Sequence, residues 1–187
     1  MALTRRIFIL SLPAAGALAA CSSSMGNGVG SSNAAQIDAR VDSTRDYLFR
    51  TYPGIQEVAS QAKGILYMPL VTEAGFFVGG SYGRGALRIN DITVDYYSAT
   101  SASFGLQIGA QQYAHALFFL TDAALENFRR SPGWVAGADL HYATPDQGAA
   151  LGTDTTKLDP VEAFVFGQQG LIVGATLQGT KYTRIIP

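Results

Sequence analysis

The spacing of apolar residues predicts helices in the first part of the chain, up to about residue 62. Between residues 34 and 51, three apolar residues lie four and seven positions apart, which places them on one stripe of a helix. They are Ile37, Val41 and Leu48. The Pro53-Gly54 pair ends this helix, and a second short helix is predicted over residues 55–62.

From residue 63 onward, short runs of β-branched and aromatic residues alternate with glycines. Such runs are too short for helices and predict strands that are separated by glycine turns. The predicted strands cover residues 64–70, 74–83, 92–99, 103–121, 136–142, 163–170, 171–179 and 180–185, and short glycine turns join the last three. One helix over residues 121–130 interrupts them, with Thr121 or Asp122 as its cap.

These elements predict a single α+β domain over residues 36–187. In this fold, N-terminal helices pack on an antiparallel, meandering β-sheet or a partly closed barrel, and one helix interrupts the strands. A segment of about 150 residues is long enough to bury a hydrophobic core. Because it contains no cysteine, packing alone must stabilise that core.

The first 20 residues have the order of a secretory signal peptide. Arg5 and Arg6 precede an apolar run over residues 7–12, and small residues then lead to Cys21, the only cysteine of the chain. The apolar run is much shorter than the ~20 residues that span a bilayer. Residues 4–9 also resemble a twin-arginine signal, so the export route stays open.

The segment Leu18 to Cys21, LAAC, resembles the lipobox of bacterial lipoproteins. The resemblance implies that Cys21 is diacylated, for example with palmitate, and becomes the first mature residue. Residues 21–35 are nearly free of large apolar groups and predict a flexible tether with a reach of about 20 Å. Ser22 resembles the residue that follows the cysteine in lipoproteins sorted to the outer membrane. We therefore expect an exported periplasmic or surface lipoprotein that is anchored by lipid to the bacterial cell envelope, at the outer membrane.

The charge of the mature chain argues against a nucleic-acid partner. Removal of residues 1–20 leaves 11 basic and 14 acidic residues, a formal net charge of −3. Affinity for nucleic acid depends on clustered cations, which this balance does not supply.

Catalytic motifs are absent from the sequence. Neither His115 nor His141 lies near a nucleophile on a strained turn, as a hydrolytic triad requires, and we predict that His115 is a hydrogen-bonded structural residue. Asp139 and His141 would share a strand face, but two ligands do not make a metal site. The glycine-rich residues 79–85 lead into another strand, so we predict a hairpin turn rather than a phosphate-binding loop. We expect no enzymatic activity, no cofactor and no metal.

Four stretches of the chain together resemble the SYLF domain. They are residues 62–88, 102–134 and 163–185 and the YPG segment at residues 52–54. The resemblance implies lipid binding, because eukaryotic SYLF proteins bind phosphoinositide membranes through an amphipathic N-terminal helix. Proteins of the fungal branch also bind and bundle actin, which an exported bacterial lipoprotein would not normally meet.

The predicted N-terminal helix lacks the cationic excess of a helix that adheres to anionic membranes. It carries three acidic and three basic residues: Asp38, Arg40, Asp42, Arg45, Asp46 and Arg50. Asp46 and Arg50 are spaced for an ion pair within the helix. Two interpretations stay open, a helix that covers the sheet and a helix that contacts lipid.

The sequence therefore predicts a membrane-anchored lipoprotein whose domain binds phospholipid or a similar amphiphile without catalysis. Cys21 is the lipid anchor, and the candidates for contact with a lipid head group are Arg40, Arg45, Arg50, Lys63, Lys181 and Arg184. The alternative is an interaction or structural module that binds another envelope protein.

Overall fold

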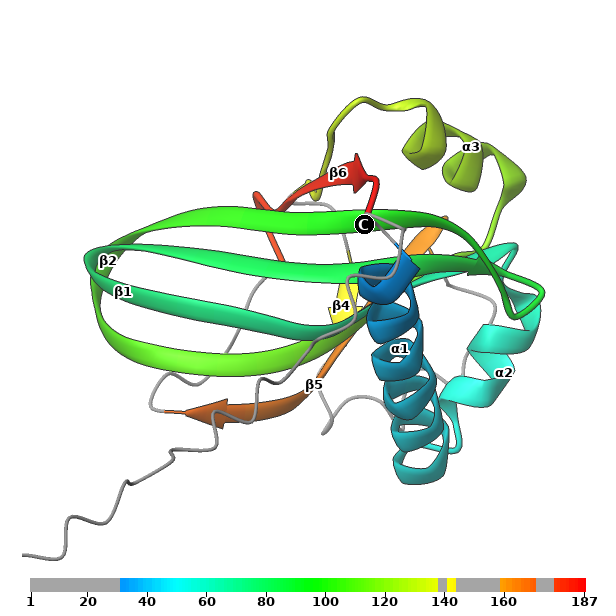
Figure 1. Ribbon diagram of the computed structural model, residues 1–187, viewed down its shortest axis with the longest axis horizontal. Helices are drawn as coiled ribbons and strands as arrows, with labels where there is room; N and C mark the ends of the chain where they lie inside the picture. The colour runs from blue at the N-terminus through cyan, green and yellow to red at the C-terminus, as the bar shows by residue number, and fades with distance from the viewer. Residues whose placement is uncertain (1–30, 138–140, 144–158, 171–176) are drawn as a thin grey trace, which may run out of the picture.

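The chain is described by a computed structural model that places residues 31–137, 141–143, 159–170 and 177–187 (Figure 1). The predicted signal peptide and Cys21 lie outside these residues. So does most of the strand that the sequence predicts over residues 171–179.

The helices agree closely with the sequence prediction. They are α1 (Ser31–Thr51), α2 (Ile55–Gln61) and α3 (Asp122–Arg130). Thr121 caps α3, because its hydroxyl accepts a hydrogen bond from the Ala124 amide at 3.2 Å. The helix α1 begins at Ser31, within the segment that the sequence predicts as tether.

Two very long strands replace several of the short predicted ones. The strands are β1 (Gly64–Ile89), β2 (Ile92–Phe119), β3 (Trp134–Val135), β4 (His141–Ala143), β5 (Val161–Gly170) and β6 (Lys181–Ile185). A tight turn at Asn90 and Asp91 joins β1 to β2, and both residues have positive φ angles, as a type I′ turn requires. The hairpin turn that we predicted at residues 79–85 is wrong, because these residues lie within β1.

Glycines within β1 allow the strand to fold back against itself. Figure 1 shows β1 and β2 both curving round at the left of the view, so that the two halves of β1 lie together in the middle of the sheet. A Cβ atom on Gly83 would lie 2.7 Å from Val71 Cγ2, and one on Gly85 would overlap the carbonyl oxygen of Tyr67. These glycines therefore serve close backbone approach rather than a turn.

The folded-back hairpin has β2 at both of its edges, and one C-terminal strand pairs with each edge. Residues 111–119 of β2 pair with β5, and residues 96–100 pair with β6. The strands β5 and β6 are therefore not neighbours, and most of residues 171–179, which we predicted as a strand between them, lie outside the described residues. All pairs are antiparallel except β4 with β5.

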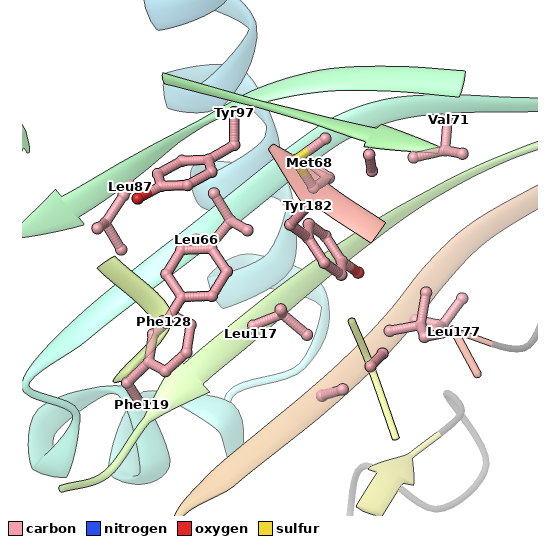
Figure 2. Packing of buried hydrophobic residues seen from close by; sticks show 14 of the residues in the cluster. Leu66, Met68, Val71, Leu87, Tyr97, Leu117, Phe119, Phe128, Leu177 and Tyr182 are labelled. Atoms are coloured by element: carbon pink, nitrogen blue, oxygen red, sulfur yellow. The ribbon is translucent and has the colours of Figure 1, made fainter. Parts of the chain in front are cut away.

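Helices pack on both faces of the curled sheet. On the outer face, α1 buries the predicted stripe of Ile37, Val41 and Leu48, together with residues of α2. On the inner face, Phe128 of α3 packs among the residues in Figure 2, with ring centroids 4.7 Å from those of Tyr97 and Phe119. The predicted α+β class is confirmed, and the sheet forms a half-barrel.

Candidate functional site

Part of the outer face of the sheet is not covered by any described helix. In Figure 1, α1 crosses the sheet near the hairpin turn, and the part beyond α1, at the left of the view, is open. Exposed side chains on this part are uncharged: Leu70, Thr72, Ala74, Val78, Gly80, Tyr82, Thr100, Ala102, Ala110 and Gln112. Eight of them are cross-strand partners, such as Tyr82 with Thr100, and therefore share one face. We call these ten residues the outer-sheet surface.

Polar side chains lie on the opposite, inner side of the same strands. The hydroxyls of Ser81 and Ser101 are 2.7 Å apart, and Gln111 Nε2 donates to Glu73 Oε2 at 2.7 Å. Ser81 and Gln111 are buried, whereas Val78 is 61 % and Tyr82 55 % exposed. In an antiparallel sheet with one face in water, polar residues normally lie on the exposed face. Here polar residues lie on the buried face. An exposed surface that carries no charge and includes Leu70, Val78 and Tyr82 is typical of an interaction site.

A groove of about 260 Å³ continues the outer-sheet surface under the edge of α1. Tyr47 of α1 and Leu70 of β1 line it, and both are more than one third exposed. The Tyr47 ring stacks on Phe166 with a centroid distance of 6.2 Å. A register shift between Met68 and Val71 interrupts the alternation of β1 at Leu70. The groove adds further exposed apolar contacts to the outer-sheet surface.

Two arginines lie at the border between α1 and the outer-sheet surface. Arg40 is exposed and shares a helical stripe with Thr44 and Tyr47, which line the groove. Arg84 follows Tyr82 at the next outward position of β1 and is partly exposed. Neither arginine forms an ion pair within the described residues. The sequence analysis did not identify Arg84 as a candidate. Its position two residues after Tyr82, on the same face of the strand, could have indicated it.

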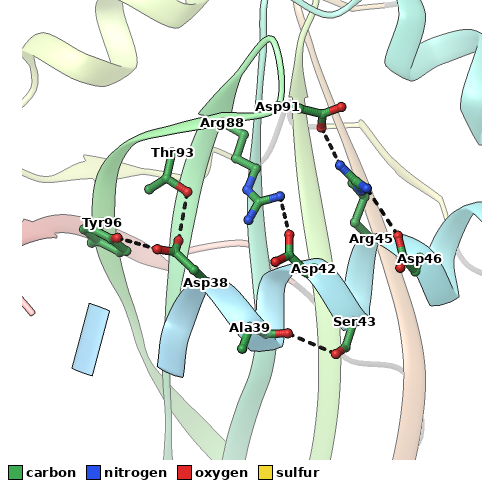
Figure 3. A network of polar contacts seen from close by, with 10 residues as sticks. All are labelled: Asp38, Ala39, Asp42, Ser43, Arg45, Asp46, Arg88, Asp91, Thr93 and Tyr96. Atoms are coloured by element: carbon green, nitrogen blue, oxygen red, sulfur yellow. Dashed lines mark hydrogen bonds and ion pairs between the residues drawn. The ribbon is translucent and has the colours of Figure 1, made fainter. Parts of the chain in front are cut away.

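Of the other two cations of α1, Arg45 belongs to the contact between the helix and the hairpin turn (Figure 3), whereas Arg50 bonds within the helix. Arg45 pairs with Asp91 at 2.8 Å and with Asp46 at 3.3 Å. Arg50 Nε donates to the main-chain oxygen of Asp46 at 3.0 Å, so the predicted ion pair between the two side chains is wrong. The carboxylate of Asp46 is bound by its neighbour Arg45 instead.

Two acidic residues of α1, Asp38 and Asp42, fix the helix to the sheet, as Figure 3 shows. Asp38 accepts hydrogen bonds from Thr93 and Tyr96, both at 2.8 Å, and Asp42 pairs with Arg88 at 2.6 Å. The apolar stripe of α1 and two of its acidic residues are therefore engaged with the sheet. Of the two interpretations of this helix, the structure supports the one in which it covers the sheet.

Of the remaining predicted cations, Lys63 and Arg184 lie away from the outer-sheet surface, whereas Lys181 borders it as the cross-strand partner of Thr100. Lys63 is exposed between α2 and β1, and Lys181 is exposed on β6. Arg184 lies against α3, where its Nη2 donates to the Arg129 carbonyl at 2.9 Å and its Nε pairs with Asp95 at 3.4 Å. The structure therefore does not bring the six predicted cations together into one head-group site.

His115 is fully buried on the inner face of the sheet. Its Nε2 lies 2.8 Å from the Tyr182 hydroxyl, which confirms the predicted hydrogen-bonded histidine. Burial lowers the pKa of His115 to about 3. Asp139 and the side chain of His141 lie outside the described residues. Among the side chains that are described, no three potential metal ligands are grouped.

The buried histidine predicts that stability falls in mild acid. The unfolded chain binds a proton at His115 below a pKa of about 6.5, whereas the folded chain does not until about pH 3. The contribution of this group to the free energy of unfolding is therefore complete above pH 6.5 and is lost as the pH falls. At pH 5 the free energy of unfolding is lower by about 2 kcal/mol. Urea unfolding at pH 7.5 and pH 5 measures the loss. His115→Gln should lose about 2 kcal/mol less than the wild type between these pH values, and an equal loss in both proteins would contradict the prediction.

No described helix is long and apolar enough to cross a membrane.

A family model described as Ysc84, Las17-binding protein actin regulator, matches residues 100–184, which include α3, β5, β6 and much of β2. No curated protein matches the chain. The matched residues contain most of β2, all of β5 and nearly all of β6, the two strands that complete the edges of the folded-back hairpin. Residues 100–184 therefore match the Ysc84, or SYLF, family, which confirms the resemblance found in the sequence.

Proposed function

We propose that this protein is a membrane-anchored bacterial lipoprotein whose SYLF domain binds phospholipid without catalysis. The observation that supports lipid binding is the outer-sheet surface, which is exposed and uncharged although the inner side of the same strands carries buried polar groups. The lipobox at Cys21 supports the anchor.

In this proposal, both apolar contacts and two cations contribute to lipid binding. Val78, Tyr82 and Leu70 contact the apolar part of the lipid, and full burial of one such side chain contributes about 1.5–3 kcal/mol. Arg40 and Arg84 lie at the border of this surface, where a phosphate would meet them. Of the six head-group candidates from the sequence, Arg40 keeps this role.

Because the anchor would keep the protein at the membrane, weak contacts between the domain and lipid would be sufficient for binding. A diacylated Cys21 would hold the protein at the bilayer, and a short tether would keep the domain at a high local lipid concentration. Contact through the apolar stripe of α1 would require the helix to leave the sheet, since Ile37, Val41 and Leu48 are buried there. We therefore assign lipid contact to the sheet.

The family description names Las17 binding and actin regulation. We propose neither for this chain, because an exported lipoprotein would not meet these partners. An envelope protein that binds the outer-sheet surface is the alternative, and it predicts indifference to lipid.

Vesicle flotation tests this function without the anchor. The mature chain with Cys21→Ser is mixed with phosphatidylethanolamine–phosphatidylglycerol vesicles, and we expect it to float with them. Val78→Glu combined with Tyr82→Glu should abolish flotation, because two charges would then lie on the apolar surface. The matched control is Ile92→Glu, which charges an exposed residue (67 %) beside the hairpin turn.

Arg40→Glu combined with Arg84→Glu tests the cations. This variant should lose binding to vesicles that contain phosphatidylglycerol more than to purely zwitterionic vesicles. If the Cys21→Ser chain floats with neither kind of vesicle, the lipid-binding proposal is wrong, and crosslinking to an envelope protein becomes the relevant assay.

A further inference from the structure

The two flanks of α1 beside its buried stripe differ in how far their polar residues are used by the fold. The flank toward the hairpin turn, with Asp38 and Asp42, is bound to the sheet (Figure 3). Because about 3.6 residues make one helical turn, Arg40, Thr44 and Tyr47 lie on the opposite flank. Thr44 and Tyr47 line the groove under α1, and Arg40 lies one turn before Thr44, about 6 Å along the helix axis. This flank therefore places a cation beside the groove.

A second cation, Arg84, lies on the sheet side of the groove. Cβ atoms added to its two neighbours, Gly83 and Gly85, would meet the carbonyl oxygens of Leu70 and Tyr67 respectively. The segment of β1 around Arg84 therefore runs beside the part of β1 that lines the groove. The Arg84 side chain is partly exposed and forms no ion pair within the described residues, so its guanidinium group is available to a ligand.

The groove itself is narrow and uncharged. Tyr47 and Phe166, whose rings stack, line it together with Pro69, Leu70 and Ala114, and none of the described lining residues carries a charge. Its volume of about 260 Å³ is below the range of about 300–1,000 Å³ that is typical of pockets for drug-sized ligands. The groove therefore has room for one narrow chain and not for the two chains of a phospholipid.

We propose that this groove binds the anion of a fatty acid, with the chain along the groove and the carboxylate facing Arg40 and Arg84. Arginine suits this head group, because its planar guanidinium can bind both oxygens of a carboxylate. The carboxylate is attached directly to the chain, so no polar linker has to enter the apolar groove. The inference rests on the proposed function, since the groove continues the outer-sheet surface, and it deepens that function by naming a single-chain ligand.

The test is a calorimetric titration of the delipidated mature chain, with Cys21→Ser, with decanoate at concentrations at which decanoate is monomeric. We expect saturable binding at one site, at least tenfold tighter than that of 1-decanol, which has the same chain length without the charge. Added salt should weaken the binding of decanoate more than that of 1-decanol. Absence of saturable binding, or equal binding of 1-decanol, would overturn the proposal.

Variants locate the site. Arg40→Gln combined with Arg84→Gln should reduce the affinity for decanoate to that for 1-decanol. Thr44→Phe places a ring in the groove and should weaken the binding of both ligands at least tenfold. Ala39→Phe is the matched control, because it adds the same ring at an exposed position of α1 outside the groove and should bind decanoate like the wild type. Unchanged binding by Thr44→Phe would contradict the assignment to the groove, whatever the arginine variants show.

Vesicle flotation of the same Cys21→Ser chain separates a failure of this proposal from a failure of the proposed function. If the chain floats with vesicles but does not bind decanoate, the groove proposal is wrong and lipid binding by the outer-sheet surface stands. If the chain binds decanoate but floats with no vesicle, the groove proposal stands and the contact of the outer-sheet surface with a bilayer is wrong.

Discussion

Gly85→Ala is expected to destabilise the domain by about 3 kcal/mol or more, because the new methyl group would overlap the carbonyl oxygen of Tyr67. Both atoms belong to β1, and neither can move without separating the two halves of the strand. A flexible side chain could yield at such a contact, whereas a backbone within a paired strand cannot. The expected loss is therefore larger than that of an ordinary small-to-large substitution in a core.

Urea unfolding followed by circular dichroism measures this loss. Gly80→Ala is the matched control, because Gly80 lies in an exposed part of the same strand. A Cβ atom there would lie 3.2 Å from the main-chain oxygen of Ser101. We expect the control to change stability by less than about 1 kcal/mol. Equal stability of the Gly85→Ala protein and the wild type would show that the halves of β1 do not meet at this residue.

Phe128→Ala is the second large expected effect, a loss of about 3–5 kcal/mol. Phe128 is the residue by which α3 reaches the inner core, and its ring contacts Tyr97, Phe119 and Trp134. Removal of the ring would leave a cavity among these side chains, and the surrounding structure fills such a cavity only in part.

Trp134 is the only tryptophan of the chain, and its ring centroid lies 5.5 Å from that of Phe128. Its fluorescence therefore reports both unfolding and the change in packing. Ile186→Ala, at a residue that is 99 % exposed, should leave stability and fluorescence unchanged. A loss below about 1 kcal/mol in Phe128→Ala would contradict the role of α3 in the core.

The helices were predictable because their signals are local. The stripe of Ile37, Val41 and Leu48, the Pro53-Gly54 stop and the Thr121 cap are each contained within a few residues. The strands were predictable as strands but not as a sheet. Gly83 and Gly85 look like turn residues in sequence, and only the contact with the first half of β1 explains them.

The candidate site was harder to predict, because it depends on which part of the sheet α1 covers. Positive charge alone suggested six cations, and the structure distributes them over separate parts of the domain. The alternation around Ser81, with Tyr82 and Gly80 beside it, is visible in the sequence. The sequence does not show which residues of this alternation are exposed, because periodicity does not tell which of the two faces is buried.

The central claim, that the outer-sheet surface contacts lipid, is tested most directly by a probe placed on that surface. In the Cys21→Ser chain, Val78→Cys provides the only cysteine for a fluorescent label, and Ile92→Cys provides the matched control. Each labelled protein is added to vesicles whose acyl chains carry nitroxide quenchers. We predict strong quenching of the label at position 78 and little at position 92; equal quenching at both positions, or none at position 78, would contradict the account.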